Sequence, residues 1–416
     1  MTDQSIAEAA ASPPTRGAGY ALFAATPAMI ALLTALSALG QFATNIYLPS
    51  LPAISDDLTA TLPQVQLTLS AFLGSFAVVQ LLYGPVSDRF GRRPVLVLGI
   101  LTYLAGCLIC ALASSVEMLI AGRVIQAAGA GAGIVVARAV VRDVFDGNDM
   151  AKVMALITIA FALVPGLTPL LGGILQDTLG WRATFFMTLL LGCVVFAAMM
   201  IKLPETNLAP LDRLDVASAI RGYGTVLRSA TFVRYALSSA FVLGGLFAFF
   251  GGSPSLFIDH LGISATEYGI YPPIAVTGFV IGGVITRRLV GRISSDKVAG
   301  VGLCLLGAGA ATMLILPLAG VLHKYGITAS MILFVTGLGV FMPTAMAAAI
   351  GAFPERAGTA AAMAGFMQMG AGALSTVLLG AMQGWSGVLA FPGIMAVFTA
   401  LAILLFAAIR RPGTTD

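Results

Sequence analysis

Long apolar runs recur along the chain, and short polar stretches separate them. Each run is about as long as the roughly 20 residues that an α-helix needs to cross the hydrocarbon core of a bilayer. The pattern therefore predicts twelve membrane-spanning helices. Their expected positions are 26–48, 65–86, 95–114, 119–142, 150–175, 182–202, 234–258, 267–288, 298–320, 327–350, 358–381 and 387–409.

The longest polar stretch between these runs is 204–232, which separates the sixth run from the seventh. It predicts a linker between an N-terminal bundle at 26–203 and a C-terminal bundle at 233–409. A weak internal repeat supports this division, because Asp88 follows the second run and Asp296 follows the eighth, 208 residues later in a chain of 416. The expected fold is an all-α integral membrane protein whose twelve helices form two pseudo-symmetric six-helix bundles.

Composition excludes a soluble globular protein. Hydrophobic residues make up 58% of the chain and charged residues only 10%, with a mean hydropathy of +0.98. One core cannot bury so much apolar surface, so the lipid bilayer is the expected surrounding. The net charge of +4 comes from arginines in loops and gives no reason to expect nucleic-acid binding.

The basic residues indicate an orientation. If both ends of the chain are cytoplasmic, nineteen basic residues fall on the inner side and only Arg123, Arg182 and Lys324 on or near the outer side. The positive-inside rule then predicts cytoplasmic termini in a bacterial cytoplasmic membrane. Residues 1–25 lack the pattern of a cleavable signal peptide and are expected to form a disordered cytoplasmic tail, with a second cytoplasmic tail at 410–416.

Neither a metal site nor a cofactor is expected. The four cysteines, Cys107, Cys110, Cys193 and Cys304, all lie inside apolar runs. Cys107 and Cys110 have the spacing of a redox or metal pair, but no histidine lies nearby in the sequence, so packing is the favoured interpretation. Nothing in the chain suggests a nucleophile with its base or a phosphate-binding loop, so an enzyme is not expected.

The segment from Gly84 to Pro94 is the most charge-dense part of the chain, with Asp88, Arg89, Arg92 and Arg93 within six positions. We call it the 84–94 segment. Its glycines, Gly84 and Gly91, allow a tight turn, and Pro94 suits the first position of a new helix. The segment is therefore expected to form a cytoplasmic hairpin between two membrane helices, with a solvated charge cluster as the simpler alternative.

Three segments carry a family resemblance. Gly84–Arg93 resembles the G-x-x-x-D-R-x-G-R-R loop of the major facilitator superfamily, in its usual place between the second and third helices. Arg123–Gly129 is similar to the fourth-helix motif of that superfamily, and Pro165–Gly173 is similar to its antiporter-associated fifth-helix motif. The resemblance implies a twelve-helix drug:proton antiporter.

Further segments resemble one branch of these exporters, the bicyclomycin- and phenicol-resistance proteins. They are Tyr47–Pro52, Arg138–Asp143 and Gly180–Arg182. The resemblance implies that residues of the matching motifs act in gating and conformational change. These are Gly84, Asp88, Arg89, Gly91, Arg92, Arg93, Arg138, Asp143, Pro165, Pro169, Gly172 and Gly173. In the fifth helix the prolines bend the backbone and the glycines let a neighbouring helix approach closely; a kinked lipid-facing helix is the alternative.

Arg123 is the most informative single residue. It stands in a run built of Ala, Val, Ile and Gly, where a charge costs roughly 2.5–3.5 kcal/mol. A cost of that size implies a water-filled cavity or a partner, and Gln126 lies three residues on, on nearly the same helix face. The alternative is that Arg123 reaches the outer lipid headgroups.

Other cavity residues are proposed from periodicity. Thr34, Ser37, Gln41 and Asn45 recur at intervals of three and four, forming a polar stripe along the first helix. The stripe is expected to line a cavity, with helix-to-helix hydrogen bonds as the alternative. Among several phenylalanines, Phe76 and Phe247 are candidates for the wall of an aromatic pocket.

The source of proton coupling is the main departure from the family pattern. Relatives in this branch often have an acid at the position of Asn45, and all eighteen acids of this chain fall in loops, tails or helix ends. The coupling candidates are then Asp259 and Glu267 at outer helix ends, Asp88 or Asp143 at an inner gate, or an ionisable group of the substrate. A buried arginine without a buried acid favours neutral or anionic substrates over cations.

An inner gate follows from the same residues. Asp88 is expected to engage the start of the eleventh helix near Gly358 and Thr359, and Arg89 or Arg92 to pair with Asp143. These contacts are expected to hold the two bundles together on the cytoplasmic side and to break when the cavity opens inward.

The sequence thus favours a monomeric exporter of small neutral or anionic amphipathic compounds, working by alternating access and coupled to protons. Two alternatives remain. One is an exporter or facilitator of a metabolite such as an amino acid, short peptide or sugar, and the other is a transport-dead membrane sensor or scaffold.

Overall fold

The computed structural model describes residues 26–211 and 216–409. The tails predicted at 1–25 and 410–416 lie outside the described residues. Apolar stretches form long helices because a helix satisfies its own backbone hydrogen bonds without water. The described part of the chain contains twelve spans that are long and apolar enough to cross a membrane, which confirms the twelve predicted runs.

The first bundle contains seven helices and a short 3₁₀ turn. In chain order they are α3 (Pro27–Asn45), η1 (Leu48–Ser50), α4 (Leu51–Asp57), α5 (Leu62–Phe90), α6 (Arg92–Ala111), α7 (Val116–Val144), α8 (Gly147–Leu179) and α9 (Arg182–Lys202). The first span consists of α3, η1 and α4 together. Within this bundle α6 packs on α7 and α9, and α3 packs on α7 and α8.

The second bundle follows a short helix in the linker, α10 (Val216–Leu227). Its elements are α11 (Ala230–Ser255), the π-helical turn η2 (Leu256–His260), α12 (Ala265–Tyr268), α13 (Tyr271–Leu289), α14 (Ser295–Leu318), α15 (Lys324–Gly351), η3 (Pro354–Arg356), α16 (Ala357–Ser386), η4 (Gly387–Leu389) and α17 (Ala390–Ala408). Here α14 and α13 pack on α15, and α11 packs on α16 and α17.

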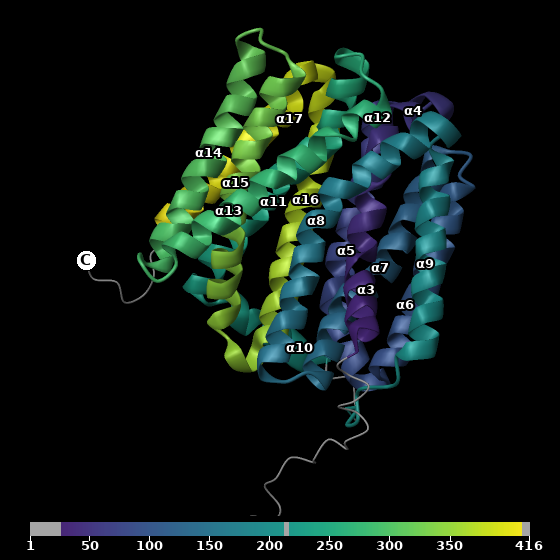
Figure 1. Ribbon diagram of the computed structural model, residues 1–416, viewed down its shortest axis with the longest axis vertical. Helices are drawn as coiled ribbons and strands as arrows, with labels where there is room; N and C mark the ends of the chain where they lie inside the picture. Colours follow the sequence, from purple (N-terminus) through teal and green to yellow (C-terminus); the bar gives the residue numbers. More distant parts are fainter. Residues whose placement is uncertain (1–25, 212–215, 410–416) are drawn as a thin grey trace, which may run out of the picture.

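The two six-helix bundles lie side by side (Figure 1). They meet where α5 packs along α16 and where α8 packs on α12 and α13. Because the number of spans is even, α3 begins and α17 ends on the same face of the molecule, which we call the terminal face. The helix α10 lies on this face, at the lower edge of Figure 1. The predicted limits of the linker, 204–232, stay a prediction.

Close helix approach explains part of the high glycine content. A Cβ atom built on Gly129 of α7 would lie 2.2 Å from the backbone nitrogen of Tyr103 in α6, a separation that no real side chain tolerates. Only glycine permits this contact between the two backbones, as is common where helices pack in lipid.

The 84–94 segment differs from the predicted hairpin. Its residues up to Phe90 continue α5, and α6 begins at Arg92, so the turn consists of Gly91 alone. Gly91 has a φ of 93°, a conformation that favours glycine. Pro94 is the third residue of α6 rather than the first, a position where the missing backbone donor is still tolerated. The single-residue turn fixes the charged side chains to the ends of two rigid helices.

Candidate substrate cavity and gates

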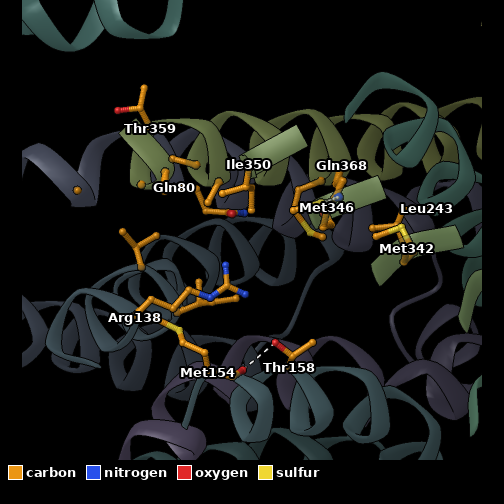
Figure 2. A pocket seen from close by; sticks show the side chains of 18 of the residues that line it. Gln80, Arg138, Met154, Thr158, Leu243, Met342, Met346, Ile350, Thr359 and Gln368 are labelled. Atoms are coloured by element: carbon orange, nitrogen blue, oxygen red, sulfur yellow. Dashed lines mark hydrogen bonds between the residues drawn. The ribbon is translucent and has the colours of Figure 1, made fainter. Parts of the chain in front are cut away.

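A cavity of about 1190 Å³ lies between the two bundles. Its walls come from α3, α5, α7 and α8 of the first bundle and from α11, α13, α15 and α16 of the second. Gln41 and Phe247 lie near the middle of the first and seventh spans, at the inner end of the cavity. The mouth is bordered by Asp88, Glu355 and α10. Figure 2 shows part of the wall, with the methionines of α15 on one side and Arg138 on the other. The cavity therefore opens toward the terminal face.

On the opposite face the bundles are joined by direct contacts. The Gln66 amide of α5 donates to the carbonyl oxygen of Gly251 in α11 at 3.0 Å. The hydroxyls of Ser70 in α5 and Thr376 in α16 are 2.8 Å apart. These groups are buried, so the contacts separate the cavity from that face. The structure thus represents a state open to the terminal face and closed on the other.

Helix α8 supplies the closest of these contacts. A Cβ built on Gly173 would lie 2.2 Å from the carbonyl oxygen of Ala265, at the start of α12 in the second bundle. Nearby, the Asp177 carboxylate accepts a hydrogen bond from the backbone nitrogen of Thr266 at 2.8 Å. Gly172, one residue earlier, faces α3 instead, where a Cβ would lie 1.8 Å from the carbonyl oxygen of Ile46.

The two prolines of this motif also lie at the interface between the bundles. Pro165 lines the cavity. The carbonyl oxygen of Pro169 would lie 2.7 Å from a Cβ built on Gly269, just before α13. The geometry puts Pro169 and Gly173 where the bundles meet on the closed side, while the role of the motif in gating stays a prediction.

Only two of the predicted cavity residues, Gln41 and Phe247, line the cavity in this state. The other predicted cavity residues do not line it in this state, and their role stays a prediction: Thr34, Ser37, Asn45, Phe76, Arg123 and Gln126. The polar stripe of α3 instead satisfies its own helix: the side chains of Thr34, Ser37 and Asn45 each donate to the carbonyl oxygen four residues earlier. Phe76 stacks on Phe72 with ring centroids 5.9 Å apart.

Arg123 is fully buried beside the cavity rather than in it. Its Nη1 atom donates to Gln126 Oε1 at 2.6 Å and to the carbonyl oxygen of Ala43 at 3.0 Å. The guanidinium also lies over the rings of Tyr47 and Phe72, 4.3 and 4.2 Å from their centroids. With no exposed surface, it does not reach lipid headgroups. Burial of the charge was expected to require a partner, and that partner is the neutral amide of Gln126.

This arginine is incompletely satisfied. Its Nε and Nη2 atoms have no hydrogen-bond partner among the described residues. The same holds for Oδ1 of Asn45, two residues from Ala43. Buried polar atoms without partners are rare in proteins and mark places where water or another arrangement completes the network.

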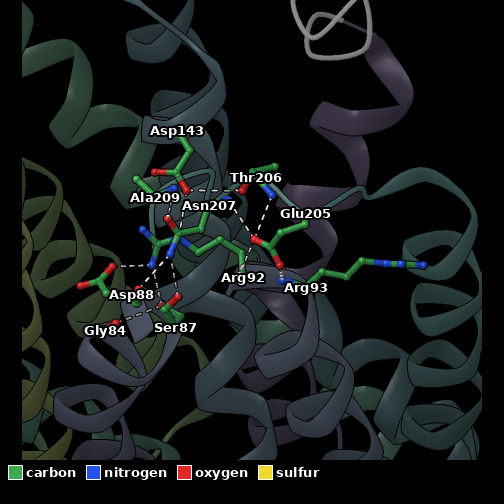
Figure 3. A network of polar contacts seen from close by, with 10 residues as sticks. All are labelled: Gly84, Ser87, Asp88, Arg92, Arg93, Asp143, Glu205, Thr206, Asn207 and Ala209. Carbon is green, nitrogen blue, oxygen red and sulfur yellow. Dashed lines mark hydrogen bonds and ion pairs between the residues drawn. The ribbon is translucent and has the colours of Figure 1, made fainter. Parts of the chain in front are cut away.

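At the terminal face, Arg92 is the centre of an ion-pair cluster (Figure 3). Its Nη1 atom lies 2.5 Å from Asp88 Oδ1, and its Nε atom 2.9 Å from Asp143 Oδ2. The expected pair between Arg92 and Asp143 is therefore present. Both residues belong to the first bundle and are paired while the cavity is open, so this pair is not the expected link between bundles that breaks on opening.

The expected contact of Asp88 with α16 is also absent in this state. Asp88 borders the same cavity mouth as Gly358 and Thr359 but has its carboxylate on Arg92. The group that approaches Gly358 is instead Arg142, whose Nη1 would lie 2.7 Å from a Cβ built there. Arg89 makes no ion pair with Asp143; its guanidinium lies 5.7 Å from the centroid of the Phe90 ring.

Sequence reasoning missed Glu205, which fastens the 84–94 segment to the linker. Its Oε1 atom accepts hydrogen bonds from the backbone nitrogens of Arg92, Thr206 and Asn207, at 2.8–2.9 Å, and Oε2 accepts from that of Arg93 at 3.0 Å. The carboxylate thus caps the positive N-terminus of α6, a task that Gly91 cannot perform. The sequence does hold one signal for such a contact: Gly91, just before α6, has no side chain that could cap the helix, so another residue has to do so.

The sequence matches the Major Facilitator Superfamily over residues 30–376. The chain belongs to this superfamily. Its members are transporters, which agrees with a cavity enclosed by two helical bundles.

Three relatives in bacteria show how far the similarity extends. Multidrug resistance protein D of Escherichia coli (strain K12) is 32% identical, over 84% of this chain and 88% of that protein. The bicyclomycin resistance protein homolog of Haemophilus influenzae is 28% identical, over 85% and 89%. The chloramphenicol resistance protein of Pseudomonas aeruginosa is 32% identical, over 81% and 80%. The relatives confirm the branch predicted from the motifs.

A solved structure supports the fold of this superfamily member. A bacterial homolog of the human lysosomal transporter Spinster, in an inward-facing and unoccupied conformation, superposes with a TM-score of 0.71 at 17% identity, covering 96% of this chain and all of that one.

Two of the predicted coupling acids, Asp259 and Glu267, are not among the residues that line the cavity, whereas Asp88 borders its mouth. Glu267, at the start of α12, is bound to Lys324 at 2.7 Å and to the Tyr271 hydroxyl at 3.0 Å. Asp259 is exposed in the π-helical turn η2. The second bundle has a similar polar cluster around Asp296. Its carboxylate accepts hydrogen bonds from Arg234 at 2.8 Å and from the Tyr235 hydroxyl.

Within residues 26–211 and 216–409, no group of three or more His, Cys, Asp and Glu side chains is arranged to hold a metal ion. Cys107 and Cys110 are buried and unpaired, and Cys107 accepts a hydrogen bond from Gln126.

Proposed function

We propose that this transporter exports small neutral or anionic amphipathic compounds across the bacterial cytoplasmic membrane by alternating access. The observation that carries the proposal is the cavity: it lies between two bundles, opens to one face, is closed to the other by close contacts and has a mainly apolar wall. Its relatives include proteins named for resistance to several drugs, to bicyclomycin and to chloramphenicol. Export of such compounds from the cytoplasm would account for resistance to them.

The charges around the cavity support the substrate class. The lining acids among the described residues are Asp88 and Glu355, both at the mouth, and Asp88 is already paired with Arg92. Arg138 and Arg142 are lining cations. A permanently cationic compound would meet repulsion and find no carboxylate deep in the cavity.

The proposed orientation places the terminal face in the cytoplasm. The basic residues of the sequence favour this arrangement, and the cavity of the present state then faces the compartment from which the substrate is taken.

Proton antiport is the proposed source of energy. The resemblance of α8 to the antiporter motif supports it. Since no acid among the described residues lines the deep part of the cavity, the candidates remain Asp259, Glu267, the Asp88–Arg92–Asp143 cluster, or an ionisable group of the substrate.

Transport by everted membrane vesicles tests this proposal. Vesicles with the protein and vesicles without it are energised by a pH gradient and given a neutral phenicol, an anionic dye and a permanently cationic dye. We expect protein-dependent accumulation of the phenicol and the anion, abolished when the gradient is collapsed, and little accumulation of the cation. Selective accumulation of the cation would refute the substrate class, and accumulation that survives collapse of the gradient would refute proton coupling.

A further inference from the structure

Arg138 is a cation on the cavity wall that no described acid neutralises. Its side chain is partly buried, and no hydrogen bond or ion pair joins its guanidinium to any of the residues that the structure describes. Arg142, one turn nearer the mouth on the same helix, adds charge of the same sign. Asp88, one of the two acids that line the cavity among the described residues, is already paired with Arg92. An arginine remains charged at any physiological pH, so this part of the wall is electropositive.

A second unpartnered polar group lies across from it. Gln80 of α5 is only 7% exposed and lines the cavity, yet its amide makes no hydrogen bond to the described residues. Figure 2 shows the ends of the Gln80 and Arg138 side chains directed into the same space. Gln80 fits there because Gly365 has no side chain: a Cβ at that position would lie 2.1 Å from Gln80 Oε1.

The two groups suit one kind of ligand. A guanidinium presents paired N–H donors in a plane, which matches the two oxygens of a carboxylate or the oxygens of a sulfonate. The free NH₂ of Gln80 adds a donor from the other side. Since buried donors without partners cost free energy, both groups gain when an acid group enters between them.

The rest of the wall suits the body of an amphipathic molecule. Met342 and Met346 of α15 lie beside this space, with Leu243 and Phe247 of α11 deeper in the cavity. Methionine side chains adapt their shape to different apolar groups, which favours a wall that accepts several compounds.

We infer that the cavity binds amphipathic organic monoanions, with the acid group held between Arg138 and Gln80 and the apolar body against the methionines of α15. The inference rests on the proposed function and narrows it: among neutral and anionic compounds, the anions bind more tightly. It also gives Arg138 a role in substrate specificity besides the gating role implied by the family resemblance.

The test is equilibrium binding to the purified full-length protein in lipid nanodiscs. The probes are two fluorescent compounds of nearly equal shape, dansylglycine, which carries a carboxylate, and dansylglycinamide, which is uncharged. Empty nanodiscs correct for partition into lipid. We expect the carboxylate to bind about tenfold more tightly than the amide, and Arg138→Gln to weaken carboxylate binding by about tenfold or more while changing amide binding less than about twofold.

Further variants check the geometry. Arg138→Lys keeps the charge without the planar fork and is expected to retain part of the preference. Gln80→Leu is expected to weaken carboxylate binding by about threefold. The control is Arg287→Gln, which removes the same charge from an exposed position at the end of α13, outside the cavity, and is expected to change nothing.

Equal affinity of the native protein for both probes, binding of neither, or an equal loss of both in Arg138→Gln would overturn the inference. Retained amide binding shows that the variant is folded. Transport of a neutral phenicol, measured separately, decides the proposed function, so a transporter without the anion preference is distinguished from a protein that transports nothing.

Discussion

Arg123 carries a positive charge in a place with no exposed surface, and none of its described partners is a carboxylate. Its described partners are an amide, a backbone carbonyl and two aromatic rings, and two of its nitrogens are unpaired. A buried charge without a counter-ion is costly, and an apolar residue of similar size is often as stable or more so. We therefore interpret Arg123 as a residue that changes partners during the transport cycle.

Arg123→Met tests this interpretation. The change keeps an unbranched side chain of similar volume, although a shorter one, and removes the charge. The free energy lost with the hydrogen bonds is then offset because no charge has to be buried. We expect the Tm in detergent to change by less than about 5 °C, and vesicle transport of the phenicol to fall at least about tenfold. The control is Arg182→Met, which removes a half-exposed arginine paired with Asp57 on the opposite face. Unchanged transport, or a large loss of stability, would show that Arg123 is a structural residue.

Other residues show why the hydrogen-bond partners of side chains could not be predicted from the sequence. The spacing of Thr34, Ser37 and Asn45 correctly places them on one helix face, but each hydroxyl or amide bonds to its own helix instead of facing the cavity. A short polar side chain satisfies its donor locally as easily as across a cavity, and spacing alone cannot distinguish the two. Gln80 was missed for the opposite reason, since it stands singly in an apolar run.

At the scale of elements, we propose that the contacts of α8 with the second bundle close the opposite face. Gly173 touches the backbone at the start of α12, and Gly166 lies where a Cβ would be 2.2 Å from the Val276 side chain of α13. Both contacts cross from one bundle to the other, so we expect them to break when the opposite face opens.

Gly173→Leu is expected to prevent that closure. The added side chain collides with the carbonyl oxygen of Ala265, which is backbone and cannot rotate away, so the equilibrium shifts toward the state open to the opposite face. In a background with Cys193 and Cys304 replaced by serine, a cysteine at Gln66 reports this opening. We expect its labelling by a membrane-impermeant maleimide to rise at least about fivefold and transport to fall by a similar factor.

The matched control is Gly283→Leu in α13, since a Cβ at Gly283 meets nothing within 4 Å. If Gly173→Leu left both labelling and transport at the level of this control, α8 would not be the element that closes the opposite face.

Helix boundaries were predictable where the signal was local. Length and hydropathy located every span in the described chain, because the bilayer imposes both on each helix independently. The turn at Gly91 was predicted too long, and the cap on α6 was missed, because it comes from Glu205, more than a hundred residues away in the sequence. Contacts of that kind depend on how α6, α9 and the linker pack together.

At the scale of the whole molecule, the structure shows one state of a cycle. The cavity is open to the terminal face, and the cluster of Asp88, Arg92 and Asp143 lies within one bundle. Closure of the mouth must bring α16, whose first residues include Gly358 and Thr359, toward the ends of α5 and α7. We propose that the contact between Asp88 and α16 forms in that second state.

Distances between spin labels on the two faces test the central claim, that the bundles alternate in opening at each face. Exposed positions serve for both pairs: Lys152 and Arg288 at the terminal face, and Leu179 and His260 at the opposite face. Each is changed to cysteine after Cys193 and Cys304 are replaced by serine, and the pairs are measured by pulsed electron spin resonance in proteoliposomes with and without the phenicol. We predict that the substrate shortens the Lys152–Arg288 distance by several ångströms and lengthens the Leu179–His260 distance in the same samples. Two distances that stay fixed, or that change in the same direction, would contradict alternating access.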